Sequence, residues 1–161
     1  DQIIRHAPCD LRLLKIGDKR EFKNCLFPTA GGPHAQLAAK VLNMLRKDFD
    51  LDITTTHVVQ HNPDSEQKEQ AEKYVDFTLG FIEDSEKIEK KLIESSSVAG
   101  GIARASRDYD LVVIGAAREP LFKKILFGEI PEKVARYSPT TVLVVKKYEG
   151  VVKSLLKKIF G

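Results

Sequence analysis

The residues best suited to ligand chemistry follow the apolar run Asp110–Gly115. Arg118 comes three residues after Gly115, nine further residues lead to Gly128, and Glu129 follows at once. Glycines let a backbone approach a phosphate closely, and the free N–H groups at the start of a helix attract anions. Ligand chemistry, if the chain performs any, is therefore expected in this loop and at the helix that follows it.

Other reactive side chains do not form a recognisable centre. His34, His57 and His61 are scattered, and no cysteine or paired carboxylate joins them, so no metal site and no catalytic residue is predicted. His57 at the end of a strand and His34 at a turn are placed to face a common crevice. The favoured interpretation is still that both are surface histidines or are satisfied by neighbouring groups.

Composition narrows the class of protein. The chain has 161 residues, 42% of them hydrophobic, which suits one buried core. With 26 basic and 23 acidic side chains and no basic stripe with aromatic residues, the sequence does not indicate nucleic-acid binding. Cys9 and Cys25 have neither metal-ligand nor disulfide spacing, which favours a reducing, cytoplasmic setting. No apolar run has the length of a membrane span, and no signal peptide opens the sequence.

Two kinds of hydrophobic pattern alternate along the chain, and turn residues separate them. Short β-rich runs alternate with segments of helical spacing, which predicts a parallel sheet covered by helices on both faces. The ligand crevice of such a sheet lies at the carboxyl ends of its strands. The expected strands are 21–29, 51–59, 88–93, 110–115 and 141–146, and the expected helices are 34–49, 65–82, 98–107 and 128–137.

The first residues of the chain repeat its last structural unit. Residues 1–15 can be placed on residues 132–146 without a gap, with Arg, Pro and Lys coinciding and most apolar positions kept. Both stretches are typical of a helix end, a proline break and a strand. We therefore expect residues 1–17 to be the end of a preceding copy, 18–147 to form one domain and 148–161 to form a tail. Chance similarity between two such units is the alternative.

The tail pairs apolar residues with a basic opposite side. Within Val151–Phe160, hydrophobic residues recur at helical spacing, and three lysines fall on the other face. This pattern predicts a C-terminal amphipathic helix. Two uses of it remain open, namely packing on its own domain or a partner, and contact with a membrane surface.

Three segments together resemble the universal stress protein family: the strand Asp110–Gly115, the loop through Val134, and the ending Pro139–Val145. The resemblance covers residues 21–146. It implies a five-stranded parallel sheet sandwiched by helices, related to adenine-nucleotide-binding domains. Nucleotide-binding members of the family carry the pattern G-x-x-G, nine residues, then G-[S/T], together with an Asp at the end of the first strand.

This sequence keeps the frame of that pattern and changes several contact positions. Gly115 and Gly128 match the outer glycines, while Arg118 replaces the second glycine and Glu129 replaces the hydroxyl residue. Arg118 adds a side chain where the backbone of the family approaches phosphate. A carboxylate in the first turn of a helix already satisfies the positive helix end and repels a polyphosphate.

The end of the first strand has changed as well. Ala30, Gly31 and Gly32 stand where binding members have Asp-Gly-Ser, and Val58 completes the degenerate crevice. Ala30 cannot accept hydrogen bonds from a nucleoside, and such a charged acceptor is worth roughly 1.5–3 kcal/mol. No cofactor is therefore expected, and ATP is expected to bind weakly at most. The opposing argument is that cations near the crevice hold another anion, namely Arg118, Lys123 and Lys124.

The expected function is regulatory or scaffolding and not enzymatic. The segment Pro28–Ala35 resembles copies fused to the C-terminus of membrane transporters such as amino-acid permeases, which implies a place on the cytosolic side of a membrane. An ATP-binding stress-response signalling protein is the alternative. The expected partners are the membrane part of such a transporter and a second copy, in a homodimer or a tandem. The copies would meet at the edge strand Thr141–Lys146, whose natural tandem partner is Asp10–Lys15.

Overall fold

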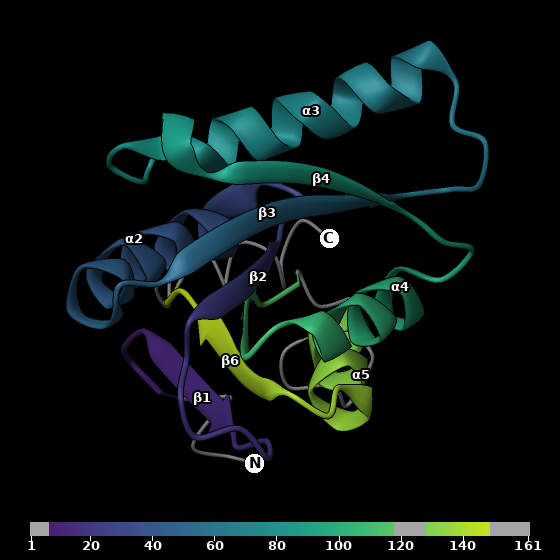
Figure 1. Ribbon diagram of the computed structural model, residues 1–161. Coiled ribbons are helices and arrows are strands. Elements are labelled where there is room, and N and C mark those ends of the chain that lie inside the picture. Colours follow the sequence, from purple (N-terminus) through teal and green to yellow (C-terminus); the bar gives the residue numbers. More distant parts are fainter. Residues whose placement is uncertain (1–6, 118–127, 149–161) are drawn as a thin grey trace, which may run out of the picture.

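The computed structural model describes residues 7–117 and 128–148, which form a mostly parallel sheet flanked by helices on both faces (Figure 1). The α/β class expected from the alternating patterns is confirmed. The strands are β1 (Leu11–Lys15), β2 (Asn24–Pro28), β3 (Asp52–Val59), β4 (Glu89–Glu94), β5 (Leu111–Gly115) and β6 (Thr141–Lys146). The helices are α2 (Gly32–Phe49), α3 (Ser65–Leu79), α4 (Val98–Ala105) and α5 (Glu129–Tyr137), with single 3₁₀ turns at Ser85–Lys87 and Ser106–Asp108.

The sheet has six strands in the order β1-β6-β5-β2-β3-β4, which corrects the expected number of five. Neighbours from β6 to β4 pair in parallel, and β1 pairs antiparallel with β6. The sixth strand is the N-terminal segment, whose expected pairing with Thr141–Lys146 is found within the same chain. An edge of consecutive valines and leucines favours such a partner, because an open apolar edge invites uncontrolled pairing.

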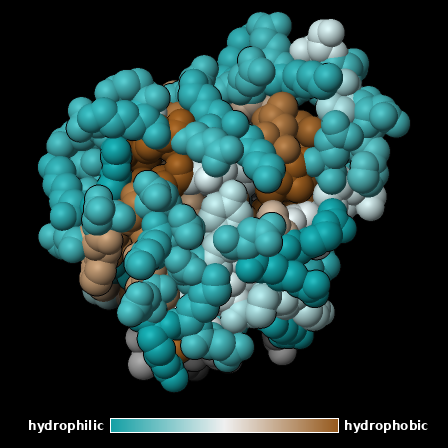
Figure 2. Space-filling view, viewed as in Figure 1, coloured by the Kyte–Doolittle hydropathy of each residue, from teal (hydrophilic) through white to brown (hydrophobic). Residues whose placement is uncertain are grey.

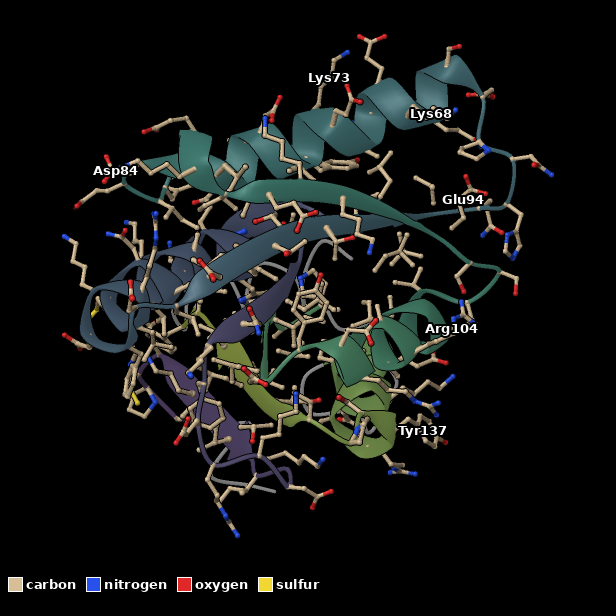
Figure 3. The ribbon with its side chains drawn as sticks, in the orientation of Figure 1. Lys68, Lys73, Asp84, Glu94, Arg104 and Tyr137 are labelled. Atoms are coloured by element: carbon tan, nitrogen blue, oxygen red, sulfur yellow. The ribbon has the colours of Figure 1, made fainter. Side chains whose placement is uncertain are left out.

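Helix boundaries follow the capping signals of the sequence. The side chain of Asp64 accepts the backbone N–H of Gln67, and the side chain of Gln67 accepts the N–H of Asp64, so a capping box begins α3. Ser97 caps α4 by accepting the N–H of Gly100. Figure 3 shows the polar outer side of α3, where Lys73 projects away from the sheet.

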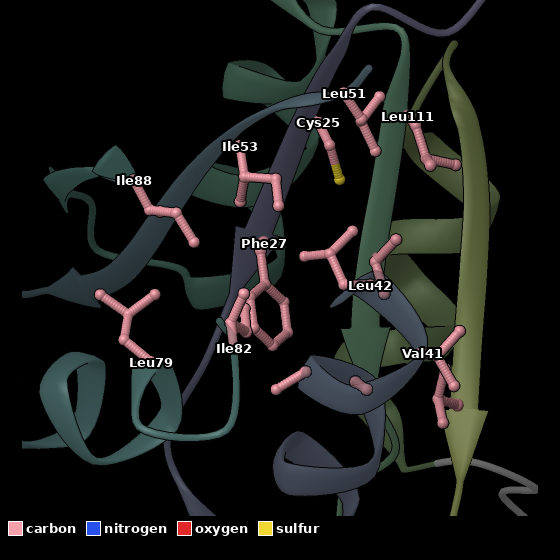
Figure 4. Packing of buried hydrophobic residues seen from close by; sticks show 14 of the residues in the cluster. Cys25, Phe27, Val41, Leu42, Leu51, Ile53, Leu79, Ile82, Ile88 and Leu111 are labelled. Atoms are coloured by element: carbon pink, nitrogen blue, oxygen red, sulfur yellow. The ribbon is translucent and has the colours of Figure 1, made fainter. Parts of the chain in front are cut away.

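Two apolar layers hold the helices against the sheet. Figure 4 shows the larger one, in which Phe27 and Cys25 of β2 lie beneath Leu42 of α2 and beside residues that lead from α3 to β4. On the opposite face α4 and α5 cover Leu26, Val112 and other residues of the central strands. From the side of Figure 1, hydrophilic side chains cover most of the surface, and hydrophobic residues show mainly in recesses between them (Figure 2).

Three expectations fall on segments outside the described residues. They are the N-terminal helix end before residue 7, the positions Arg118, Lys123 and Lys124, and the amphipathic helix Val151–Phe160. The division of the chain at residues 17 and 147 also stays a prediction. Within the described ranges, no helix is both long enough and apolar enough to cross a membrane.

Candidate functional site: a crevice at the carboxyl ends of the strands

A cavity of about 440 Å³ lies where β2, β3 and β5 end and where α2, α4 and α5 begin. This is the position at which α/β sheets of this kind hold ligands. Its lining consists of Pro28–Ala35, Thr56–Val58, Val98, Ile102, Ile114–Ala117, Ile130 and Pro131.

The structure brings most of the predicted site residues together. Ala30, Gly31, Gly32, Val58 and Gly115 all line this cavity, although they come from three separate parts of the chain. Two more predicted residues stand next to it, since Gly128 and Glu129 directly precede the lining residue Ile130. Arg118 lies outside the described residues. Five of the predicted residues thus share one cavity.

At the end of β2 the polar side chain is that of Thr29, and Ala30 offers no polar side-chain group to a ligand. The side chain of Ala30 is an exposed methyl group. The neighbouring Thr29 is buried, and its hydroxyl accepts the N–H of Gly31 at 3.1 Å and lies 2.8 Å from the hydroxyl of Thr78. Because Thr78 donates its own proton to the carbonyl of Tyr74, Thr29 must donate to Thr78. These bonds fix the strand end to α3 without offering a carboxylate to a ligand.

His57 presents a defined tautomer to the cavity. Its Nδ1 lies 2.7 Å from the carbonyl oxygen of Thr29, which can only accept, so Nδ1 carries a proton. The ring packs on Tyr74, with centroids 5.3 Å apart and planes inclined by 33°. In the neutral ring the remaining nitrogen, Nε2, is an acceptor. Among the residues that line the cavity, His57 is thus a positioned group that can receive a hydrogen bond from a ligand.

His34 has the opposite arrangement. It is buried, and its Nδ1 accepts the backbone N–H of Lys147 at 3.0 Å. An N–H group can only donate, so Nδ1 of His34 carries no proton and the neutral ring has its proton on Nε2. Both histidines therefore line the crevice, as their places in the sequence allowed. Both are also hydrogen-bonded to backbone groups, as the favoured interpretation expected. Tyr74 was not predicted as a site residue, because it lies on the polar helix α3 and no motif marks it.

Gly115 is needed for packing. A Cβ at this position would lie 2.8 Å from the backbone nitrogen of Ala35 and 2.8 Å from the carbonyl carbon of His34. The start of α2 therefore touches the end of β5 at a distance that only glycine allows. The first glycine of the family pattern thus has a structural reason in this chain that does not depend on a bound phosphate.

Gly128 and Glu129 shape the beginning of α5. Gly128 has a φ of +91°, and a Cβ there would lie 2.5 Å from the Cβ of Ala117. Glu129 is the first residue of the helix and pairs with Lys133 at 2.6 Å, with both side chains about half exposed. This hydrogen bond raises the pKa of Lys133 above its usual range. The expected acidic residue in the first turn is thus present, so the helix start is less attractive to a polyphosphate.

The crevice is poor in charge. No Asp, Glu, Lys or Arg belongs to its lining within residues 7–117 and 128–148. Over the same ranges, no three His, Cys, Asp or Glu side chains gather as metal ligands. Its hydrogen-bonding groups are backbone amides, the hydroxyl groups of Thr29 and Thr56, and two histidine rings. This chemistry suits an uncharged ligand with an apolar body better than a polyphosphate.

Comparison with known proteins places the fold and the motif in one family. The model of the universal stress protein family matches residues 21–146, and the chain belongs to this family. No curated protein matches the sequence.

Solved structures agree with this assignment. The hypothetical protein MJ0577 is 21% identical, with a TM-score of 0.68 over 81% of this chain and 100% of that chain. A universal stress protein in complex with cAMP is 17% identical, with a TM-score of 0.60 over 80% and 99% of the two chains. A universal stress protein from Archaeoglobus fulgidus DSM 4304 is 18% identical, with a TM-score of 0.60 over 86% of this chain and 50% of that chain. At these identities the likeness extends to the fold alone.

Proposed function

We propose that this domain is a regulatory or scaffolding module whose nucleotide crevice has degenerated, and that it acts without catalysing a reaction. The observation that supports this proposal most is the side-chain chemistry of the crevice. The cavity persists, but its strand end offers the methyl group of Ala30, and the helix start beside it carries Glu129. Neutral lining and a carboxylate at the helix N-terminus both disfavour a polyphosphate.

Direct binding measurements test this proposal. Titration calorimetry of the purified chain with ATP·Mg²⁺, AMP and cAMP is expected to give no binding with a dissociation constant in the micromolar range. Native mass spectrometry is expected to find no co-purified adenine nucleotide. Micromolar affinity for any of the three, or a co-purified nucleotide, contradicts the proposal.

The second candidate is an ATP-binding stress-response signalling protein. It is favoured by the size of the cavity, about 440 Å³, which is large enough for a small ligand. A relative of similar fold binds cAMP. The calorimetric titration separates the two candidates, because a signalling protein must bind its nucleotide at cellular concentrations.

We further propose that the parent protein is a membrane transporter of the amino-acid permease type, with this domain on the cytosolic side. The support is the resemblance of the segment Pro28–Ala35 to domain copies that are fused to such transporters. This segment forms the end of β2 and the start of α2, and it lines the crevice. Sequencing the complete gene tests the proposal. Several apolar spans of about 20 residues upstream are expected, and a complete gene without such spans contradicts the transporter context.

A further inference from the structure

The pairing of β1 with β6 has the symmetry of two equivalent strands. The sequence repeat relates residues 1–15 to residues 132–146, a shift of 131 positions. Under this shift Leu13 corresponds to Val144, and these two residues lie directly opposite each other in the sheet. Leu11 pairs with Lys146 and Lys15 pairs with Val142, so exchanging the two copies reproduces the same pairs. Every antiparallel register keeps its pairs under this exchange, but in this one a residue faces its own counterpart, so the two-fold axis passes between Leu13 and Val144.

Two hydrogen bonds beyond the strands follow the same symmetry. The backbone N–H of Gly17 donates to the side chain of Thr141 at 2.9 Å. The backbone N–H of Tyr148 donates to the side chain of Asp10 at 2.8 Å. Under the shift of 131 positions Gly17 corresponds to Tyr148 and Asp10 to Thr141, so each bond is the counterpart of the other. Two equivalent elements related by a two-fold axis make contacts of this reciprocal kind.

The equivalence holds on one side of β1 and fails on the other. The far edge of β6 pairs with β5, and the carbonyl of Val145 accepts the N–H of Ala116 at 2.8 Å. Leu14 corresponds to Val145, so its carbonyl faces the far edge of β1. Figure 1 shows β1 as the outermost strand beside β6, and no described strand lies beyond it. Val145 is fully buried, whereas Leu14 is 58% exposed.

Two further apolar side chains are exposed, one just after β1 and one on α2. Ile16, just after β1, is 64% exposed, and Met44 of α2 is 65% exposed. Met44 follows Val41 by three residues, so the two share one stripe of the helix. Val41 lies beside β6 in Figure 4, and β6 pairs with β1, so this stripe lies on the side of α2 that covers this end of the sheet. Exposed residues of this kind on an open strand edge indicate a surface that another structure covers.

We propose that the outer edge of β1 and the surface formed by Leu14, Ile16 and Met44 receive a second α/β domain equivalent to this one. β1 is the last strand of that domain, which therefore precedes it in the same polypeptide. A strand equivalent to β5 pairs in parallel with β1, and a helix equivalent to α2 covers Leu14. A relative of similar fold is consistent with this arrangement, since this chain covers half of it. The proposal does not depend on what the crevice binds.

A duplicated chain tests the proposal, built by placing residues 18–131 directly before residue 1 of the full chain. The readout is hydrogen exchange of the backbone amides of Arg12 and Leu14, which face the outer edge of β1. Exchange at both amides is expected to slow by at least about 100-fold relative to the single chain, because a new ladder hydrogen bond protects each. Unchanged exchange at both amides in a folded duplicated chain overturns the proposal.

A matched duplication guards against simple misfolding. In it, residues 132–146 replace residues 1–15, so that the front copy keeps its own last strand. If this control folds as two domains while the test duplication leaves its front copy unfolded, residues 1–15 are not a last strand and the proposal is wrong. The substitution Leu14→Lys gives a second readout. It is expected to shift the melting temperature of the single chain little and to unfold the front domain of the duplicated chain, as Val145→Lys does for the rear domain.

The tail of the chain is the competing occupant. If the amides of Arg12 and Leu14 already exchange slowly in the full single chain, and exchange rapidly after residues 149–161 are removed, the tail covers this surface. That result also overturns the proposal. Rapid exchange both with and without the tail is the expected result.

Discussion

The ammonium group of Lys19 lies 2.6 Å from one carboxylate oxygen of Asp110. The other oxygen accepts the backbone N–H groups of Lys23 at 2.9 Å and Asn24 at 3.0 Å. One buried carboxylate at the start of β5 thus holds the segment between β1 and β2. The hydrogen bond from Lys19 is the largest cause that lowers the pKa of Asp110, and burial opposes it.

The first prediction is that Asp110→Ala lowers the free energy of unfolding by about 2–3 kcal/mol, because it leaves two backbone N–H groups without an acceptor. The folded-state pKa of Asp110 is below its unfolded value of about 3.9. The stabilisation is therefore complete well above pH 4 and is lost as the pH falls through the lowered pKa. Urea unfolding at pH 7 and pH 3 measures both effects.

The exposed pair Asp76 and Lys90 provides the control for this measurement. Its atoms also lie 2.6 Å apart, but both side chains are more than half exposed. Asp76→Ala is expected to change stability by less than about 0.5 kcal/mol, because solvent screens such pairs. Equal losses from the two substitutions would contradict the role given to Asp110.

The second prediction concerns Gly115. Gly115→Ala is expected to destabilise the domain by about 1–3 kcal/mol, because the added Cβ meets backbone atoms of α2 that cannot move aside independently. Gly80→Ala is the matched control, since a Cβ there lies at an ordinary 3.5 Å from the nearest atom. Thermal unfolding of both variants without nucleotide provides the comparison. A Gly115→Ala protein as stable as the control would mean that this glycine serves a ligand and not the packing.

The sequence predicted the fold well because its signals are local. Asp64 and Gln67 reveal the start of α3, and the apolar run before Gly115 reveals a central strand. Boundaries were right to within a few residues, and that of the closing strand β6 agreed at both ends. The sixth strand, β1, was expected to pair with Thr141–Lys146, but the repeat assigned it to a preceding copy, so it was not counted among the strands of this sheet.

The site was only partly predictable, because part of it depends on contacts between elements that are far apart in the sequence. The glycine spacing indicated one strand end and one helix start, and Gly115 of this pattern lines the cavity. The tautomers of His34 and His57 depend on backbone groups of Lys147 and Thr29, which no spacing along the chain indicates. The packing role of Gly115 against α2 was also invisible, because it needs the distance between two elements.

The third prediction is that the two thiols differ strongly in reactivity. Cys25 is fully buried, and burial raises the pKa of its thiol far above the usual range. Cys9 is exposed. A thiol reagent at pH 8 is expected to modify Cys9 at least about 100-fold faster than Cys25, because the thiolate is the reactive form. Mass spectrometry of native and urea-unfolded protein measures the two rates, and rapid labelling of Cys25 in the native state would contradict the described core.

The last prediction restores the family's ligand groups to the crevice. Ala30→Asp supplies a charged acceptor at the end of β2, and Glu129→Ser removes a carboxylate from the first turn of α5. An added charged hydrogen bond is worth roughly 1.5–3 kcal/mol, so the double variant is expected to bind ATP·Mg²⁺ about 10- to 100-fold more tightly than the parent chain. Glu72→Ser on the exposed side of α3 is the control, for which no gain is expected. Calorimetry on all three proteins decides the matter.

Because Glu129 and Lys133 are both about half exposed, losing their ion pair costs little stability, and a folded double variant is expected. If that folded variant gains no affinity, the strand end at Ala30 and the start of α5 do not form the place where a nucleotide would bind.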